Sequence, residues 1–309
     1  MVVSILGHPK VSSFLRKTRI WRKYPRFQTL FEELPKFFPE EDWVSWLREC
    51  QKWEKEKNPH WKLLTYDDEL YPRSLLEIFD PPLVLVCMGD VTLLQRELVA
   101  IVGTRKASPI SLTATKALVR SLSEWKQISI VSGMALGIDR QAFVSALEMG
   151  IPVVGVLGTT LGTEYPPGNR DLYKRMKLDP KQLLLSEFLL YTEPARWTFP
   201  KRNRVISGLS QKVFIMESGK KSGTISTAKS AMEQNRDIFV FDHPKQFDNE
   251  GGKMLLRQGA EPVRVQFAES EEKGNQLDPK VVSYEEWFRE KNTSYVRKRE
   301  EVSDFQIIL

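Results

Sequence analysis

The sequence has few of the residues that cross-link a protein or bind a metal. Among its 309 residues are two cysteines, Cys50 and Cys87, and three histidines, His8, His60 and His243, all far apart. Two cysteines cannot build a disulfide framework, and they are typical of reduced cytosolic thiols. No spacing of cysteine and histidine fits a metal site. We therefore expect a cytoplasmic protein with neither a metal nor a cofactor.

Long apolar runs are also missing. No stretch approaches the roughly 18 consecutive apolar residues that a membrane-spanning helix needs. The short apolar run in MVVSILGHPK has no basic segment before it and no small-residue cleavage site after it. We expect no membrane association and no signal peptide.

Nucleotide-hydrolysis motifs are absent as well. The spacing G-x-G-x-x-G does not occur after the first expected strand of the parallel sheet. The segment Gly219-Lys220-Lys221-Ser222 is similar to the end of a P-loop, but Phe214 stands where the motif needs its first glycine. No set of nucleophile, base and orienting residue is visible either. These absences favour a binding protein over an enzyme.

Positive charge is present and unevenly distributed. The net charge is +6, with a pI near 9.1. Two segments carry basic residues and no acidic ones: Lys10, Arg16, Lys17, Arg19, Arg22, Lys23 and Arg26 in the first, and Arg196, Lys201, Arg202 and Arg204 in the second. Each segment is either a solvated face or a contact for a polyanion such as nucleic acid. Because four basic residues are hard to bury, we expect the second segment to face solvent or a ligand.

Three zones follow one another along the chain. Residues 1–58 have apolar residues three and four positions apart, which predicts a small helical domain, and the segment KWEKEKNPH (52–60) is a plausible linker. Residues 59–268 alternate between strand and helix patterns. Residues 269–309 begin with a charged, turn-forming stretch and are too few for an independent core, so we expect a C-terminal appendage.

The middle zone predicts an α/β fold. Apolar runs of strand length recur every 25 to 30 residues or so, and helical patterns separate several of them. The predicted strands are 98–103, 128–132, 153–157, 183–186, 213–217 and 238–241, and the predicted helices are 112–122, 139–149 and 224–234. Strands that are apolar on both faces indicate a doubly wound, mostly parallel sheet covered by helices on both sides.

Ligands of such sheets bind beyond the carboxyl ends of the strands. Small or basic residues follow four predicted strands there. They are Gly103, Thr104 and Arg105; Ser132, Gly133 and Gly137; the loop that ends in Phe199, Lys201, Arg202 and Arg204; and Ser222, Gly223 and Thr224. Small residues at a strand-to-helix turn let the backbone approach a phosphate, arginine adds a planar charged fork, and an aromatic ring can stack on a base.

Each of these features has a purely structural alternative. The glycines could simply permit tight turns, and Phe199, which precedes Pro200, could be a core aromatic that closes a loop. Asp139 could cap a helix rather than belong to a site.

Together the motifs resemble those of the DprA/Smf family, the DNA-processing protein A family. The resemblance runs from about residue 63 to 265. It is carried by LLTYDDELYPRSLLEIFDPPLVLVCMGD (63–90), AIVGTRKAS (100–108), SGMALGID (132–139), GTTLGTEYPPGN (158–169), SEF (186–188), FPKRNRVISGLS (199–210), SGTISTA (222–228) and EGGKMLLRQGA (250–260).

The resemblance implies an extended Rossmann-like domain that dimerises and binds single-stranded DNA without sequence preference. It also implies a role in natural transformation, in which the protein loads the RecA recombinase onto incoming DNA. The residues that it assigns to the DNA pocket are Arg105, Arg196, Phe199, Arg202 and Arg204, together with the turn of Ser222, Gly223 and Thr224.

The sequence departs from the family pattern in three places. At Ile225 and Ser226 the family tends to have leucine followed by isoleucine or threonine. Phe143 replaces a histidine that the family usually has four residues after the aspartate of the GID motif, and we expect it to pack against the sheet. The C-terminal winged helix found in many members does not fit in this tail. An alternative function stays open: a Rossmann-like sensor could bind a small nucleotide-derived ligand with the same turns. An enzyme similar to the nucleotide phosphoribohydrolases is disfavoured, because the stretch 221–227 lacks the glutamate of their glycine-rich turn.

Overall fold

The computed structural model describes residues 1–125, 127–189, 195–243, 249–268 and 278–281. Its strands are β1 (Lys62–Thr65), β2 (Val84–Gly89), β3 (Glu97–Val102), β4 (Ile128–Ser132), β5 (Val153–Leu157), β6 (Leu183–Ser186), β7 (Lys212–Ile215), β8 (Asp237–Phe241), β9 (Glu261–Val263), β10 (Val265–Ala268) and β11 (Asp278–Val281). Its α-helices are α1 (Pro9–Thr18), α2 (Phe27–Glu33), α3 (Glu40–Glu56), α4 (Arg73–Leu76), α5 (Pro109–Leu122), α6 (Ile138–Glu148), α7 (Arg170–Leu178), α8 (Thr198–Leu209), α9 (Gly223–Glu233) and α10 (Glu250–Arg257).

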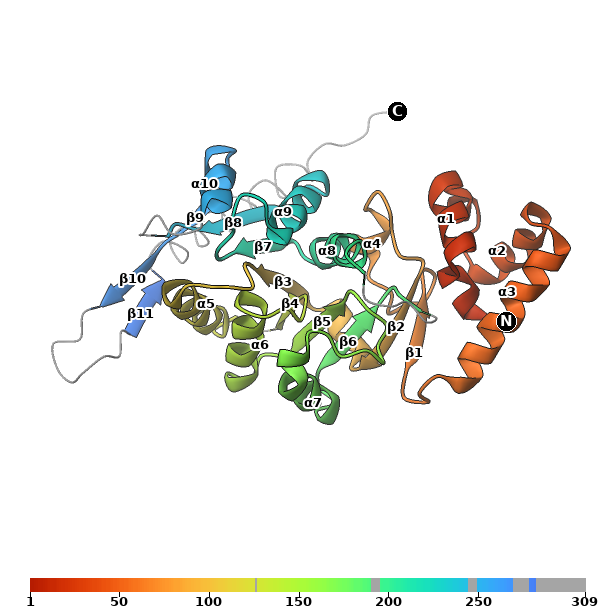
Figure 1. Ribbon diagram of the computed structural model, residues 1–309, viewed down its shortest axis with the longest axis horizontal. Coiled ribbons are helices and arrows are strands. Elements are labelled where there is room, and N and C mark those ends of the chain that lie inside the picture. The colour runs from red at the N-terminus through yellow and green to blue at the C-terminus, as the bar shows by residue number, and fades with distance from the viewer. Residues whose placement is uncertain (126, 190–194, 244–248, 269–277, 282–309) are drawn as a thin grey trace, which may run out of the picture.

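A nine-stranded sheet in the order β1-β2-β6-β5-β4-β3-β7-β8-β9 forms the centre of the molecule (Figure 1). The seven strands β6, β5, β4, β3, β7, β8 and β9 run parallel to one another. Strand β2 is antiparallel to both of its neighbours, β1 and β6. The chain winds from β3 through β4 and β5 to β6 on one side, and through β7 and β8 to β9 on the other. The predicted α/β, doubly wound, mostly parallel sheet is confirmed.

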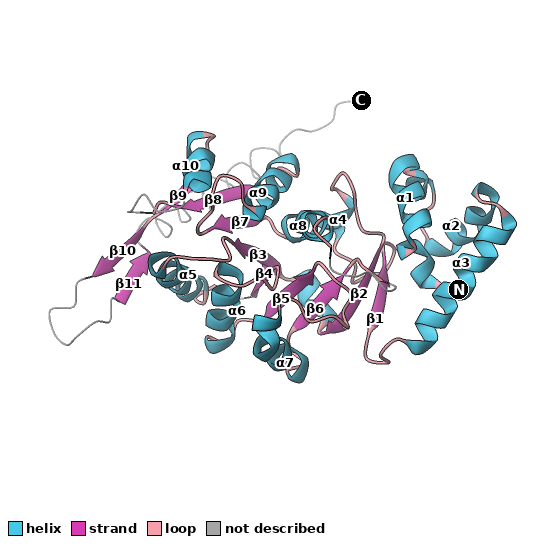
Figure 2. Cartoon of the chain, viewed as in Figure 1, coloured by secondary structure: helices cyan, strands magenta, loops and turns pink. Residues whose placement is uncertain are grey.

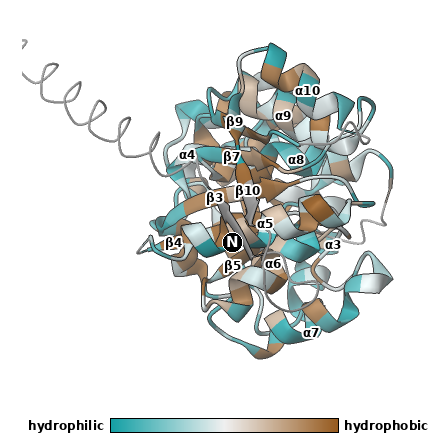
Figure 3. Cartoon of the chain, turned by 90° about the vertical axis from the view of Figure 1, so that its left-hand side faces the viewer, coloured by the Kyte–Doolittle hydropathy of each residue, from teal (hydrophilic) through white to brown (hydrophobic). Residues whose placement is uncertain are grey.

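Helices cover both faces of this sheet. Helices α5, α6 and α7 lie on one face, and α4, α8, α9 and α10 lie on the other (Figures 1 and 2). Each face has its own cluster of buried apolar side chains, because strands buried on both sides must pack against a helix layer above and below. Figure 3 shows hydrophobic residues gathered along the central strands and hydrophilic ones spread over the outer helices.

The six predicted strands are all present, and three of them, β4, β5 and β6, have the predicted bounds. The three predicted helices correspond to α5, α6 and α9. Phe143 is fully buried on α6, as expected. Strands β1, β2 and β9 were not predicted. The segment around Phe199 was predicted to be a loop up to Arg204, but α8 begins at Thr198, and Pro200 lies in its first turn, where proline is tolerated.

The N-terminal 58 residues are helical, as the apolar spacing indicates. Three α-helices and the short 3-10 helices at Val3–Gly7, Ile20–Lys23 and Leu34–Phe37 pack beside β1 and β2. The hydroxyl of Tyr66 donates to the carbonyl of Tyr24 at 2.7 Å, and the Phe27 amide donates to the Asp67 carboxylate at 2.9 Å. The buried apolar side chains of the N-terminal helices belong to the apolar cluster on one face of the sheet. Helix α3 runs on to Glu56, so half of the predicted linker is helix.

The predicted appendage at 269–309 lies outside the described residues, apart from β11. This strand pairs with β10 in a separate two-stranded sheet. The expectation that the tail holds no winged helix therefore stays a prediction. In the part of the chain that the structure describes, no helix is both long enough and apolar enough to cross a bilayer.

Candidate nucleic-acid interface

A cavity of about 470 Å³ opens at the carboxyl edge of the sheet, where β3 and β7 lie side by side. The chain turns in opposite directions from these two strands, so the cavity lies at the topological switch point where open α/β sheets bind ligands. Its walls come from the β3–α5 loop, the start of α8 and the start of α9. The residues lining it are Val102, Gly103, Thr104, Arg105, Lys106, Ala135, Asp139, Phe199, Pro200, Arg202, Asn203, Ile206, Ser222, Gly223, Thr224 and Thr227.

Arg105 and Phe199 form the cationic and aromatic side of this cavity. Arg105 is exposed, and its guanidinium carbon lies 5.7 Å from the centre of the Phe199 ring. Tyr165 lies on another side of that ring, with the two ring centres 5.3 Å apart. Phe199 is half-buried, so it is not the fully buried core aromatic of the structural alternative. An accessible ring beside a free guanidinium can stack on a nucleobase while the charge meets a phosphate.

The first turn of α9 faces the same cavity. Ser222 precedes the helix, and Gly223 and Thr224 begin it, where backbone N–H groups lack partners within the helix. A Cβ atom placed on Gly223 would meet nothing within 4 Å, so the space in front of this turn is open. The partial positive charge of a helix start favours an anion there.

In the turn after β4, the predicted donors of Ser132 and Gly133 are already used within the fold, which corrects part of the prediction. The Ser132 hydroxyl donates to the carbonyl of Ile101 at 2.6 Å, and the Gly133 amide donates to the Asp139 carboxylate at 3.0 Å. Ser132, Gly133 and Gly137 do not line the cavity. Instead Gly137, with φ of 72°, lets two loops approach, because a Cβ there would lie 2.3 Å from the Thr104 carbonyl oxygen. At Gly133 and Gly137 the structure therefore agrees with the alternative in which the glycines permit tight turns.

Gly103 and Thr104 do line the cavity, yet their backbone is largely committed to the fold. The Thr104 amide donates to the Glu217 carbonyl at 2.8 Å, and the Thr104 carbonyl accepts from the Ile138 amide. A Cβ on Gly103 would collide with the Ile138 side chain at 2.5 Å. Asp139 is not the helix cap that the alternative proposed, because Gly137 occupies the cap position.

Arg202 is buried, with 6% of its surface exposed. Its Nη1 donates to the carbonyls of Gly133 at 2.6 Å and Val156 at 2.5 Å, and its Nε donates to the Asn203 side chain. Burial lowers the pKa of Arg202 to about 10, while the charge of Asp139 acts in the opposite direction. Burial likewise raises the pKa of Asp139, against the charge of Arg202. Arg202 thus forms part of the cavity wall, and two backbone carbonyls and the charge of Asp139 compensate its positive charge.

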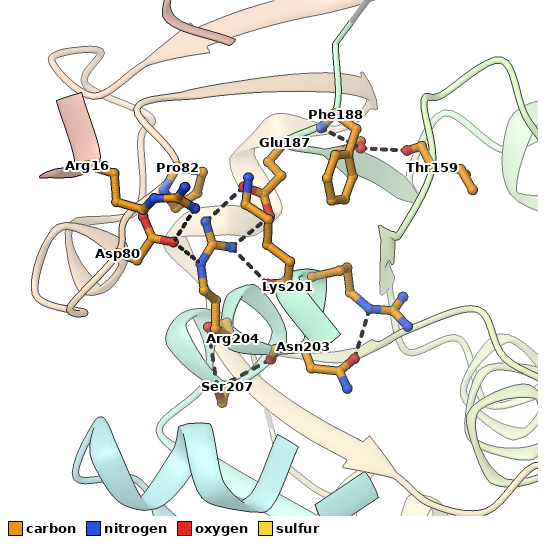
Figure 4. Close-up of polar contacts among 12 residues, drawn as sticks. Arg16, Asp80, Pro82, Thr159, Glu187, Phe188, Lys201, Asn203, Arg204 and Ser207 are labelled. Carbon is orange, nitrogen blue, oxygen red and sulfur yellow. Dashed lines mark hydrogen bonds and ion pairs between the residues drawn. The ribbon is translucent and has the colours of Figure 1, made fainter. Parts of the chain in front are cut away.

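Arg204 points away from the cavity, toward two acids (Figure 4). Its guanidinium makes a two-pronged contact with Glu187, at 2.7 and 2.8 Å, and its Nε lies 3.2 Å from Asp80. Burial would lower the pKa of Arg204, but the charges of Glu187 and Asp80 outweigh it and raise the pKa. Lys201 lies 3.3 Å from Glu187 as well. The prediction that the basic segment faces solvent or a ligand is therefore wrong for Arg204, whose guanidinium is paired with acids distant in sequence. Arg202 does line the cavity, but it also donates to two backbone carbonyls.

Three further site residues escaped the sequence analysis. Lys106 is exposed and lines the cavity beside Arg105. The sequence could have indicated it, because Lys106 directly follows Arg105. Asn203 accepts from Arg202 and donates to the Gly223 carbonyl at 3.1 Å, so it joins α8 to the start of α9. Tyr165 is far from Phe199 in sequence and gave no signal. Arg196 is exposed just before α8, but it does not line the cavity.

Known proteins share this architecture. The profile of the family described as DNA recombination-mediator protein A matches residues 62–272. The chain belongs to this family. It is 40% identical over 214 residues to protein Smf of Synechocystis sp., covering 68% of this chain and 52% of that protein. It is 37% identical over 187 residues to the DNA processing protein DprA of Streptococcus pneumoniae, covering 60% and 64%. The chain thus spans between half and two thirds of the length of these two relatives.

Solved structures of the family have the same fold. The X-ray structure of DprA from Streptococcus pneumoniae superposes with a TM-score of 0.64 at 30% identity, covering 71% of this chain and 78% of that one. A structure that concerns the single-stranded DNA binding mode of DNA processing protein A from Helicobacter pylori superposes with a TM-score of 0.59 at 31% identity, covering 65% and 90%. The extended Rossmann-like fold of the middle zone is therefore established.

Proposed function

We propose that this chain binds single-stranded DNA, without sequence preference, in the cavity at the carboxyl edge of the sheet. The observation that carries the proposal is the pair of Arg105 and Phe199, which offers an exposed guanidinium and an accessible ring on one side of the cavity. The start of α9 lies on another side as an anion-binding turn. Stacking and backbone charge are the two interactions that sequence-tolerant single-strand binding requires.

The wider role that we propose comes from family membership. In it the chain loads RecA recombinase onto incoming DNA during natural transformation, acts as a homodimer and works in the cytoplasm. The two cysteines, which are buried and unpaired, are consistent with a reducing compartment. We further propose that the chain carries out no turnover. Among the described residues that line the cavity, Asp139 is the one acid, and two backbone N–H groups, of Gly133 and Ala135, already occupy its carboxylate.

Fluorescence anisotropy with a labelled oligothymidylate tests the DNA proposal. The single strand should bind more tightly than a duplex of equal length, because a base can reach the Phe199 ring only when it is unpaired. The affinity should fall as salt rises, since phosphate contacts release counterions. Equal binding of the duplex, or an affinity that is indifferent to salt, would contradict the proposal.

The volume of the cavity favours one alternative, a sensor of a small nucleotide. About 470 Å³ is within the usual range for small-molecule sites. Calorimetry against a panel of mononucleotides and nucleotide derivatives distinguishes the two functions. Micromolar binding of one nucleotide, without measurable affinity for oligonucleotides, would favour the sensor.

A further inference from the structure

A second cationic and aromatic contact lies outside the cavity, between α1 and the loop that precedes β2. Phe79 in this loop is 79% exposed, the highest exposure among the large hydrophobic side chains described. The guanidinium carbon of Arg19 lies 4.2 Å from the centre of its ring. Arg16 lines the same shallow hollow. We call Phe79, Arg19 and Arg16 the Phe79 platform. An aromatic ring left in solvent beneath an arginine has the composition of a base-stacking surface.

The platform lies at the same edge of the sheet as the cavity. Strand β2 runs antiparallel to β6, with Val86 opposite Ser186, so the loop that precedes Val84 lies beyond the carboxyl end of β6. The cavity lies beyond the carboxyl end of β3, and three strands, β4, β5 and β6, separate β3 from β2. Four strand spacings of about 4.8 Å place the two features on the order of 19 Å apart along the edge. A strand longer than the cavity holds could extend from one to the other.

Two acids described between the cavity and the platform, Asp80 and Glu187, are paired with basic side chains. Asp80, next to Phe79, lies 3.2 Å from the Arg204 guanidinium and 3.7 Å from that of Arg16. Glu187, directly after β6, is paired with Arg204 and Lys201 (Figure 4). A polyanion that passes along this edge therefore does not meet an unpaired carboxylate at either position. The segment 10–26, to which Arg16 and Arg19 belong, carries seven basic residues and no acid.

The backbone conformation of Arg19 is unusual for a residue with a side chain. Arg19 ends α1 in the left-handed conformation, with φ of 52°, and its amide donates to the Leu15 carbonyl at 2.9 Å. Glycine is the usual residue at this position, because a Cβ atom makes the conformation unfavourable. Here the left-handed turn carries an arginine whose guanidinium lies over Phe79.

We propose that the Phe79 platform is a second contact for the same single strand, at which a base stacks on Phe79 and Arg16 and Arg19 bind phosphates. This inference rests on the proposed function, because it extends the path of the strand that the cavity binds. It predicts two classes of oligonucleotide. Short ones occupy the cavity alone, whereas longer ones reach the platform and gain affinity from it.

Anisotropy with oligothymidylates of about 5 and about 20 nucleotides, within and beyond the usual range for one single-strand site, tests the inference. We expect Phe79→Ala to weaken binding of the long oligonucleotide by about 10-fold, the effect of losing one stacked base, and Arg19→Ala to weaken it by several-fold. Binding of the short one should not change for either variant. Leu178→Ala, which truncates another apolar side chain that is 74% exposed, and Lys229→Ala on α9 are the matched controls. Both should leave both affinities unchanged.

Three results would overturn the inference. Unchanged affinity of Phe79→Ala for the long oligonucleotide would show that no base stacks there. Equal losses for both lengths would show that the variant acts through the cavity. If the unaltered protein binds neither length, the proposed function itself fails, and this pattern is distinct from a platform defect. Thermal unfolding of each variant shows that the fold is retained, as expected for a side chain so exposed.

Discussion

Helix α8 carries one basic motif with two different flanks. On the cavity flank, Phe199 is accessible, and Arg202 lines the same cavity with its Nη1 bound to two backbone carbonyls. On the opposite flank, Lys201 and Arg204 face Glu187 and Asp80. Neighbouring basic residues in one motif therefore have different roles. Within this motif two arginines stabilise the fold, while the exposed charge at the cavity comes from Arg105 and Lys106 on another loop.

Arg202→Ala should have the largest effect on stability. The substitution removes a buried cation and leaves Asp139 and the carbonyls of Gly133 and Val156 without it. We expect a loss of about 3–5 kcal/mol in the free energy of unfolding, as for other broken buried charge pairs. Urea denaturation measures it, and Arg105→Ala, at an exposed position, should change stability by less than about 0.5 kcal/mol. A stable Arg202→Ala protein that cannot bind DNA would instead make Arg202 a ligand contact.

Arg204→Ala should be the next most destabilising change. It removes two charge-assisted contacts with Glu187 and one with Asp80, and we expect a loss of about 2–3 kcal/mol. A double-mutant cycle with Glu187→Gln sharpens the comparison, because removing the carboxylate charge should recover part of the loss in Arg204→Ala. Additive losses in the cycle would mean that the two side chains do not stabilise each other.

Phe199→Ala should act on binding. The loss of a stacking ring costs about 1–3 kcal/mol of binding free energy for the base that it holds. Anisotropy with an oligothymidylate measures this change, and Phe199→Trp, which retains an aromatic face, should keep most of the affinity. If Phe199→Ala binds normally, the ring only fills the space beside Tyr165.

Arg105→Ala should give the smallest of these effects and the most specific one. We expect a loss of about 1 kcal/mol that is the same for every sequence tested, and a salt dependence whose slope falls by about one counterion. Lys229→Ala, on an exposed face of α9, should alter neither quantity. An unchanged slope in Arg105→Ala would remove Arg105 from the set of phosphate contacts.

The sequence predicted the fold better than it predicted the site. Strands β4, β5 and β6 are mostly apolar and buried along their whole length, and this pattern does not depend on partners elsewhere in the chain. Strand β1 has a charged residue at its exposed first position, so it lacks the buried apolar run by which β6, of the same length, is recognised. The start of α8 reads as a loop because proline and four polar or charged residues follow Phe199, although proline is compatible with a first helical turn.

The errors about the basic segment have a single physical cause. Whether an arginine faces the cavity or the interior depends on which acceptors the fold brings to it. Arg204 meets Asp80 from 124 positions away, and Arg202 meets Gly133 from 69 positions away. No local pattern contains those partners. The turn of Ser222 to Thr224 does stand at the start of a helix and line the cavity, and a small-residue turn before a helix is a local feature of the sequence.

Cross-linking of a bound strand tests the central claim most directly. An oligothymidylate carrying 5-iododeoxyuridine is bound, irradiated and digested with the protein, and the attached peptides are identified by mass spectrometry. The proposed function predicts attachment at Phe199 or Tyr165, because these accessible rings lie together at the cavity. Attachment confined to peptides at the opposite end of the strands would contradict it. The segment 232–238, which lines a different hollow at that end, is one such peptide.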